Sequence, residues 1–277
     1  MTTVAERIGR ADLTPAERRV AEVVLEAPEA VAFGTVARVA ERASTSGPSV
    51  VRAAVALGFD GFAELQAAVQ EELAGRLRPA AERIRRRPAP DPLARALEVE
   101  LENVHATLVA VDPASFSRAV TWLAEAPRVA VVSGDATFGV AHSLVSTLSL
   151  LRDGVDLAVG SPVQVMQRLA LLDAGDALVA IDLRRYERWV LDAVANVCGR
   201  AATVAITDSV LSPLAQDADA AFVVDAQGAG PFDSHVGTLA LANALVSAVS
   251  GRLRRTAARR LDRIENAWAE ADTLMRP

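Results

Sequence analysis

Lysine is absent from this 277-residue chain, so all 29 of its basic residues are arginines. The absence excludes two classes of protein. A P-loop ATPase needs its lysine on the nucleotide phosphates, and a pyridoxal or Schiff-base enzyme needs a lysine amine as nucleophile. This exclusion holds whether the cause is a codon bias toward arginine or a selection for arginine chemistry.

Cysteine and long apolar runs are also scarce. The single cysteine, Cys198, excludes an internal disulfide and a cysteine-rich zinc site, and we expect it to be an inert packing residue. The three histidines are too scattered for a helical zinc site, so we expect no metal and no cofactor. No run of about 18 uncharged apolar residues predicts a membrane span, and the first residues lack the apolar centre of a signal peptide. We therefore expect a cytoplasmic protein.

The composition is that of a globular protein with room for two domains. Apolar residues make up 51% of the chain, which is ample for packed cores. The net charge of −6 argues against a protein that coats nucleic acid indiscriminately, but it leaves room for a local basic surface that reads DNA.

Residues 1–78 carry the pattern of short helices. Thr14 and Glu17 have the spacing of a capping box at the start of one helix. A second helix follows Thr35 and a third follows Ser46, with only a brief turn between them. Two short helices joined in this way and braced by others predict a helix-turn-helix DNA-binding domain.

The rest of the chain alternates strand and helix patterns. Residues 79–110 are expected to be an Arg/Pro-rich linker followed by a connecting helix. Residues 111–252 then predict a doubly wound, five-stranded parallel sheet of the α/β class. Residues 253–277 predict a charged amphipathic helix for packing or dimerisation. The five apolar segments expected as strands are 128–134, 155–160, 176–183, 202–208 and 220–226.

Two stretches resemble a known family. The order of LTPAER, an alanine-rich helix, VVR, LGFDGF and then TVAITDSVLSPLA is similar to RpiR-type bacterial transcriptional regulators, which join a helix-turn-helix domain to a SIS (sugar isomerase) domain. The resemblance spans nearly the whole chain. It implies a regulator that binds operator DNA as a homodimer or homotetramer, has no membrane partner, and senses a phosphosugar or related anionic metabolite in its SIS domain.

The third helix is the expected reading helix, and Arg52 is its best base or phosphate reader. Family members usually place an aromatic and a basic pair after this arginine, whereas here alanines and a valine follow. Residues 1–78 hold nine arginines against eleven acidic residues, a net charge of −2. Linker arginines Arg83, Arg85, Arg86 and Arg87 either supplement this surface or are simply solvated. The helix positions expected to face away from the core are Gly47, Pro48, Ser49, Arg52, Ala53 and Ala56. The expected DNA-binding residues are Arg38, Arg42, Ser46, Gly47, Ser49 and Arg52.

The ligand site is expected where the parallel strands end. After the first strand the family usually has a glycine-rich turn that holds phosphate, and here SGDATFG inserts Asp135. After the third strand, DLRRYE replaces a hydroxyl-rich loop. Arg184 and Arg185 either clamp an anionic ligand, or form a structural salt bridge with Asp135 or a subunit contact, or are idle and solvated. The expected ligand-binding residues are Ser133, Gly134, Asp135, Thr137, Arg184, Arg185, Thr207 and Ser209.

Two other functions remain open at this point. A phosphosugar isomerase would need a general base, and Glu187 and His235 are the only candidates that can be placed near strand ends. A SIS-type ligand-binding protein whose DNA binding has decayed would explain the sparse reading helix. The helix-turn-helix pattern favours a regulator that is not an enzyme.

Overall fold

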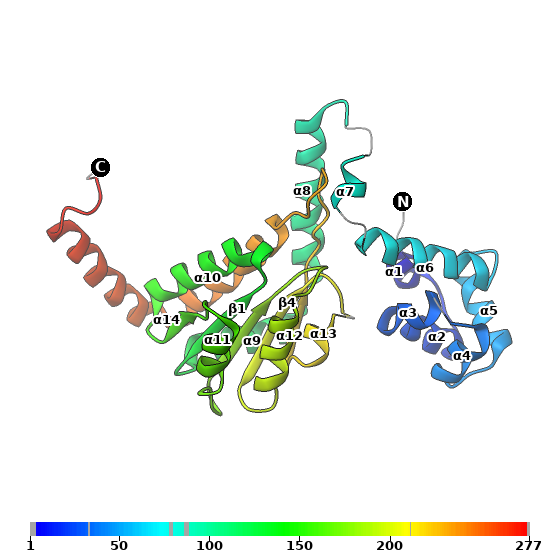
Figure 1. The fold of residues 1–277 in the computed structure, drawn as a ribbon, viewed down its shortest axis with the longest axis horizontal. Coiled ribbons are helices and arrows are strands. Elements are labelled where there is room, and N and C mark those ends of the chain that lie inside the picture. Colours follow the sequence, from blue (N-terminus) through cyan, green and yellow to red (C-terminus); the bar gives the residue numbers. More distant parts are fainter. Residues whose placement is uncertain (1–3, 33, 78–79, 86–88, 211, 276–277) are drawn as a thin grey trace. The chain divides into compact units, whose positions relative to one another are not determined.

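The computed structural model of the protein describes residues 4–32, 34–77, 80–85, 89–210 and 212–275. The chain forms two compact units, Met1–Glu82 and Arg83–Pro277 (Figure 1). Two of the linker arginines discussed above, Arg86 and Arg87, lie outside the described residues.

The first unit is helical, as the sequence predicts. The capping box is present, because the Thr14 amide donates to Glu17 Oε2 at 3.0 Å. Thr35 caps the next predicted helix by accepting from the Arg38 amide. Buried valines, alanines and leucines from these helices form one core. The helices of this unit are α1 (Val4–Arg10), α2 (Pro15–Glu26), α3 (Pro28–Ala32), α4 (Val36–Arg42), α5 (Gly47–Ala56) and α6 (Phe62–Leu77). Helix α7 (Ala80–Arg83) runs across the boundary between the units.

The second unit is built on a parallel five-stranded sheet with strand order β2-β1-β3-β4-β5. The strands are β1 (Val129–Ser133), β2 (Val155–Leu157), β3 (Ala177–Ile181), β4 (Ala202–Thr207) and β5 (Ala220–Val223). The predicted fold class is confirmed, and each strand lies inside one of the five expected apolar segments. Strands β1 and β3 are buried along their whole length because both faces of the sheet are covered.

Helices cover the sheet on both faces (Figure 1). One apolar core joins the sheet to α9, α10 and α14, and the other joins it to α11, α12 and α13. The helices of this unit are α8 (Pro92–Val109), α9 (Pro113–Glu125), α10 (Phe138–Leu151), α11 (Pro162–Leu169), α12 (Arg188–Val197), α13 (Pro213–Gln216) and α14 (Val236–Glu270), with a short 3-10 helix η1 (Asp135–Thr137).

Helix α14 is long and apolar enough to pass for a membrane span on length and composition alone. Its apolar residues Leu241, Leu245 and Val249 are fully buried in the core of the second unit. One such helix is weak evidence for a span, and a core helix passes the same test. Arg254, with φ of 25°, interrupts the helical backbone where the charged tail begins.

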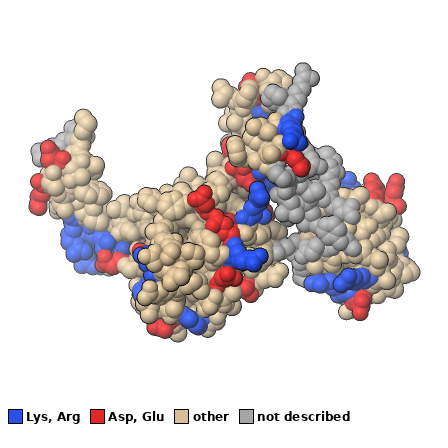
Figure 2. Space-filling view, in the orientation of Figure 1, with Lys and Arg blue, Asp and Glu red and all other residues tan. Residues whose placement is uncertain are grey.

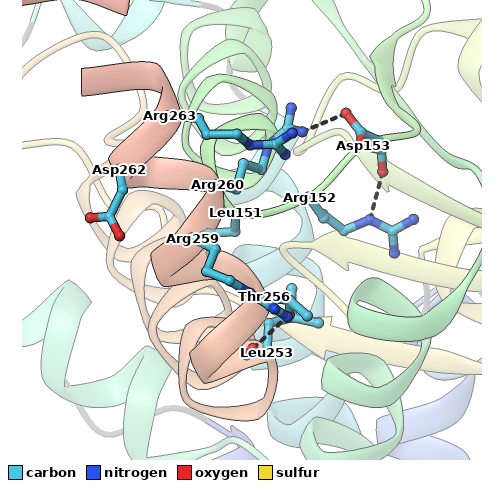
Figure 3. Close-up of a pocket in the computed structure, with 9 residues that line it drawn as sticks. All are labelled: Leu151, Arg152, Asp153, Leu253, Thr256, Arg259, Arg260, Asp262 and Arg263. Carbon is cyan, nitrogen blue, oxygen red and sulfur yellow. Dashed lines mark hydrogen bonds and ion pairs between the residues drawn. The ribbon is translucent and has the colours of Figure 1, made fainter. Parts of the chain in front are cut away.

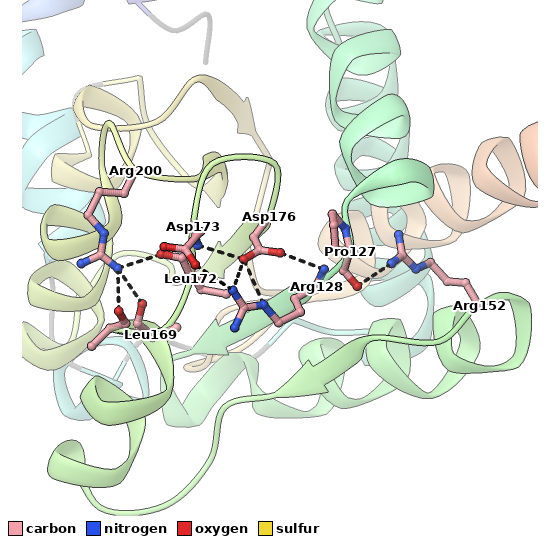
Figure 4. Close-up of polar contacts among 9 residues, drawn as sticks. Pro127, Arg128, Arg152, Leu169, Leu172, Asp173, Asp176 and Arg200 are labelled. Carbon is pink, nitrogen blue, oxygen red and sulfur yellow. Dashed lines mark hydrogen bonds and ion pairs between the residues drawn. The ribbon is translucent and has the colours of Figure 1, made fainter.

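The amino-terminal edge of the sheet is fixed by a polar network (Figure 4). Asp176 accepts from the Arg128 guanidinium at 2.5 Å and from the amides of Arg128 and Asp173. Arg200 donates to the main-chain oxygens of Leu169 and Leu172, each at 3.0 Å. These contacts join the segments that precede the strands, at the edge of the sheet opposite the expected ligand site. We therefore infer that they stabilise the fold.

Candidate functional site

The candidate DNA-reading surface is the exposed face of α5. Arg52 is exposed on it, and its Nη2 donates to Ser49 Oγ at 2.8 Å. Arg38 and Arg42 on α4 are also exposed. Ser46, the residue before α5, is exposed, and its hydroxyl lies 3.0 Å from that of Ser49.

Two residues expected on the outer face of α5 are buried instead. Ser49 is 5% exposed and Ala53 is fully buried. The buried face of α5 is two residues wide. Ser49 and Val50 face the core in one turn, and Ala53 and Ala54 face it in the next. The prediction that Ser49 and Ala53 face outward is therefore wrong. Ser49 holds the guanidinium of Arg52, and the sequence reasoning missed Val51 and Val55 on the exposed side.

The candidate ligand site lies at the carboxyl ends of β1, β3 and β4. In a sheet of order 2-1-3-4-5, the chain reverses its winding between β1 and β3, and ligands bind in the crevice there. The structure brings the expected residues to this edge: Ser133, Gly134, Asp135 and Thr137 follow or end β1, Arg184 and Arg185 follow β3, and Thr207 and Ser209 end or follow β4.

The turn after β1 is tightly built. The Thr137 hydroxyl is buried and donates to the main-chain oxygen of Ile181 at 2.8 Å. A side chain at Gly134 would place its Cβ 2.5 Å from Asp182 Oδ1, so a larger residue would have to displace this carboxylate. Thr137 is thus engaged with the backbone, and Gly134 leaves room for Asp182.

Glu187 closes the start of η1. Its carboxylate accepts from the Asp135 amide at 2.5 Å and from the Trp189 indole at 2.6 Å. The resemblance to RpiR-type regulators implies that the backbone amides of this turn face a phosphate. Here a carboxylate of the chain itself takes the Asp135 amide.

Asp182 is a buried acid that the sequence reasoning missed. It accepts from the amides of Leu183 at 2.9 Å and Glu187 at 2.7 Å. Burial raises its pKa to about 6, against the effect of these hydrogen bonds, and the charges of Glu187 and Asp208 raise it further. The signal in the sequence was an aspartate directly after a fully apolar strand.

Asp208, after β4, organises the loop after β3. Its Oδ1 accepts from the Arg184 amide at 2.9 Å and from the Tyr186 hydroxyl at 2.7 Å. Burial, followed by the charge of Asp208, raises the pKa of Tyr186 to about 12, so this hydroxyl stays protonated. Thr207 and Ser209, on either side of Asp208, are buried.

Arg184 and Arg185 differ in environment. Arg184 has φ of 58°, and its side chain, only 15% exposed, pairs with Asp233 Oδ1 at 3.3 Å. The expected structural partner, Asp135, is therefore not the partner in this chain. Arg185 lies in the loop after β3, and its side chain is exposed.

A separate arginine-lined cleft lies beside the charged tail of α14 (Figure 3). Figure 2 shows arginines gathered over this tail. Arg152 donates to the main-chain oxygen of Leu123 at 2.9 Å, and Arg260 pairs with Asp153 at 2.5 Å, so both are engaged with the fold. The cleft encloses about 640 Å³ and is lined by Leu151, Arg152, Asp153, Leu253, Thr256, Arg259, Arg260, Asp262 and Arg263.

Cys198 follows α12 and is exposed, so its expected packing role is wrong. The helical pattern of this segment continues through Val197, which is buried, and ends one residue before the cysteine.

The protein joins a helical unit with a helix-turn-helix to a doubly wound α/β unit, an arrangement typical of DNA-binding transcriptional regulators that carry a sensor domain. Models of two known domain families match the chain. Residues 3–76 match the helix-turn-helix domain of the rpiR family, and residues 123–248 match the SIS domain. The chain therefore joins an rpiR-family helix-turn-helix domain to a SIS domain, as RpiR-type transcriptional regulators do.

Individual relatives agree with this assignment. The HTH-type transcriptional regulator HexR of Pseudomonas aeruginosa is 27% identical over 212 residues, covering 74% of this chain and 72% of that protein. The sugar isomerase domain of an RpiR transcription factor from Sphaerobacter thermophilus is 29% identical, with a TM-score of 0.58, over 63% of this chain and 98% of that one. NanR of Vibrio vulnificus, solved in complex with ManNAc-6P, shares the fold with a TM-score of 0.59 at 18% identity. The two structures superpose over 97% of this chain and 99% of the NanR chain.

Proposed function

We propose that this regulator binds operator DNA through α5 and changes its DNA affinity when an anionic metabolite, of the phosphosugar or sugar-acid type, occupies the crevice of its SIS domain. The observation that carries the proposal is the presence in one chain of an rpiR-type helix-turn-helix and a SIS domain. The NanR relative, solved with a sugar phosphate, supports the ligand class.

The proposed ligand contacts combine cations with hydroxyls. Arg185 is exposed at the crevice and Arg184 lies next to it, and a guanidinium binds a carboxylate or phosphate with two parallel hydrogen bonds. The acids Asp182, Glu187 and Asp208 are already engaged with main-chain amides. We infer that the arginines receive the charged end of the ligand and that Ser133, Gly134, Asp135, Thr137, Thr207 and Ser209 form the walls.

We propose that the domain senses its ligand without turnover, as a cytoplasmic protein. Glu187, one of two candidate bases, is held by two N–H donors. Burial lowers the pKa of the other, His235. The observation that favours an isomerase instead is Asp182, because a carboxyl with a pKa of about 6 suits a general base.

We propose a dimer that forms through α8. Four leucines stand exposed along this helix at spacings of four or seven residues, and an exposed apolar stripe of this kind is typical of an association surface. They are Leu93, Leu97, Leu101 and Leu108.

Ligand-induced thermal stabilisation tests the sensor. A panel of sugar phosphates and sugar acids is screened, with turnover monitored in parallel. Replacing Arg184 and Arg185 together by alanine is expected to eliminate the stabilisation, because stabilisation follows ligand occupancy of the native state. Arg184 also pairs with Asp233, so the melting temperature is compared with and without ligand within each variant.

The control is Arg255→Ala, which removes an exposed arginine of α14. Unchanged stabilisation in the double variant would refute the arginine clamp. Sustained isomerisation of any panel member would show that the domain is an enzyme.

A further inference from the structure

One carboxylate in the second unit is shared by two arginines. Arg83 Nη1 lies 2.5 Å from Asp233 Oδ1, and Arg184 Nη1 lies 3.3 Å from the same oxygen. The three side chains are only 15 to 20% exposed. This cluster of Arg83, Arg184 and Asp233 is hereafter the Asp233 cluster.

The Asp233 cluster has more positive charge and more donors than its carboxylate satisfies. Two guanidiniums face one carboxylate, and the Nε atoms of both arginines are buried with no hydrogen-bond partner. The neighbouring imidazole of His235 adds no positive charge near neutral pH, because burial lowers its pKa. The nearby acid Glu100 accepts from the Ser234 hydroxyl at 2.5 Å and from the Asn103 amide. Buried guanidinium donors without acceptors are the arrangement that an oxyanion completes.

The positions of the three residues connect the crevice to the start of the unit. Arg184 follows β3 at the point where ligands bind in such sheets, and the Asp208 carboxylate holds its amide. Asp233 lies in the loop between β5 and α14. Arg83 is the first residue of the second unit, directly after the unit that contains the helix-turn-helix.

We propose that Arg83 and Arg184 together form the receptor for the anionic group of the effector, and that Asp233 is a resident counter-ion which this group displaces. This inference rests on the proposed function and adds Arg83 and Asp233 to its site. A phosphate or carboxylate presents two oxygens and can bridge both guanidiniums. Because Arg83 begins the sensor unit, exchange of its partner changes how the preceding segment is held and thereby transmits occupancy toward the DNA-binding unit.

Inorganic phosphate is the probe for the receptor, because it carries the shared chemistry without the sugar. Full-length protein is melted in phosphate and in chloride at equal ionic strength. Phosphate is expected to stabilise the wild type more than chloride does. The Arg83→Ala variant loses this difference, Arg83→Lys keeps part of it, and Asp233→Asn binds phosphate roughly tenfold more tightly because no carboxylate competes.

The matched control is Glu125→Gln, which breaks an exposed ion pair with Arg252 in the same unit. This variant is expected to respond to phosphate as the wild type does, and melting in chloride shows that each variant folds. Equal phosphate stabilisation of the wild type, Arg83→Ala and Asp233→Asn overturns the receptor.

A ligand-free measurement tests the role of Asp233 at the linker. Trypsin cleavage after the exposed Arg85 is expected to be roughly three- to tenfold faster in Asp233→Asn than in the Glu125→Gln control, because Arg83 is then released from its carboxylate. Equal cleavage rates contradict the anchoring of Arg83. If phosphate binding behaves as expected but no sugar phosphate alters operator binding, then the proposed function fails while the receptor stands.

Discussion

At the scale of single residues, three carboxylates of the candidate site are held by main-chain amides. Asp182, Glu187 and Asp208 each accept from at least one main-chain N–H. Such bonds stabilise the charged form, whereas burial opposes it. In Asp182 burial prevails, and its pKa rises to about 6.

Asp182 predicts an unusual dependence of stability on pH. Its pKa is higher in the folded than in the unfolded protein, so the folded state binds the proton more tightly and the free energy of unfolding increases as pH falls from 7 toward 4. The Asp182 contribution is about 2 to 3 kcal/mol over this range. Denaturant titrations of the wild type and Asp182→Asn at several pH values measure it.

The two proteins are compared by the slope of the free energy of unfolding against pH. The absolute values also differ because the Asp182→Asn substitution removes one acceptor for the amides of Leu183 and Glu187. His235 acts in the opposite direction in both proteins, since its lowered pKa costs stability as the pH falls. Identical pH slopes for the two proteins would show that Asp182 does not titrate in this range.

Arg52 is predicted to carry specific DNA binding. It is the long donor on the exposed face of α5, and Ser49 holds its guanidinium. Arg52→Ala is expected to cost about 1 to 3 kcal/mol of operator binding while leaving the fold intact. A mobility-shift titration measures the loss. Arg10→Ala, at an exposed position of α1, is the control, and normal operator binding by Arg52→Ala would mean that α5 is not the reading helix.

At the scale of elements, the sequence predicted the strands and most helices because their periodicity and caps are local signals. Apolar runs marked all five strands, and Thr14, Thr35 and Ser46 marked helix starts. The width of the buried stripe on α5 depends on how closely α2 and α6 pack against it, which no local pattern contains. Ser49 and Ala53 were misplaced for that reason.

The candidate site was predicted in outline only. The sequence placed its residues at the strand ends, and parallel topology brings those ends together at one edge of the sheet. The partner of Arg184 could not be read from the sequence, since Asp233 is 49 positions away and reaches Arg184 through the loop after β5. The engagement of Glu187 with Asp135 likewise depends on the tertiary fold.

The exposed leucines of α8 predict that the protein forms a dimer. Leu97 is 63% exposed and Leu101 is 62% exposed on this helix. Replacing both by glutamate is expected to convert a dimer into a monomer, because charges in an apolar interface lose their hydration. Light scattering after size exclusion measures the mass. The control is Val163→Glu, at an exposed position of α11, and a double variant with unchanged mass would exclude α8 as the interface.

At the scale of the whole molecule, the protein joins an acidic reading unit to a sensor. The net charge of −6 and the sparse donors on α5 limit nonspecific attraction to DNA, so binding must depend on a few specific contacts. We propose that the regulator responds to small changes in the geometry of the proposed dimer, which an effector bound to the SIS domain can supply.

The central claim is tested by measuring the affinity of the full-length protein for its own upstream DNA and for random DNA at one fixed salt concentration. Both titrations are made with and without the sugar phosphate that stabilises the protein most. The account predicts a preference of about 10³ or more for the upstream DNA and a change of at least about fivefold with the effector. Equal affinity for both DNAs, unaffected by any panel member, would contradict it.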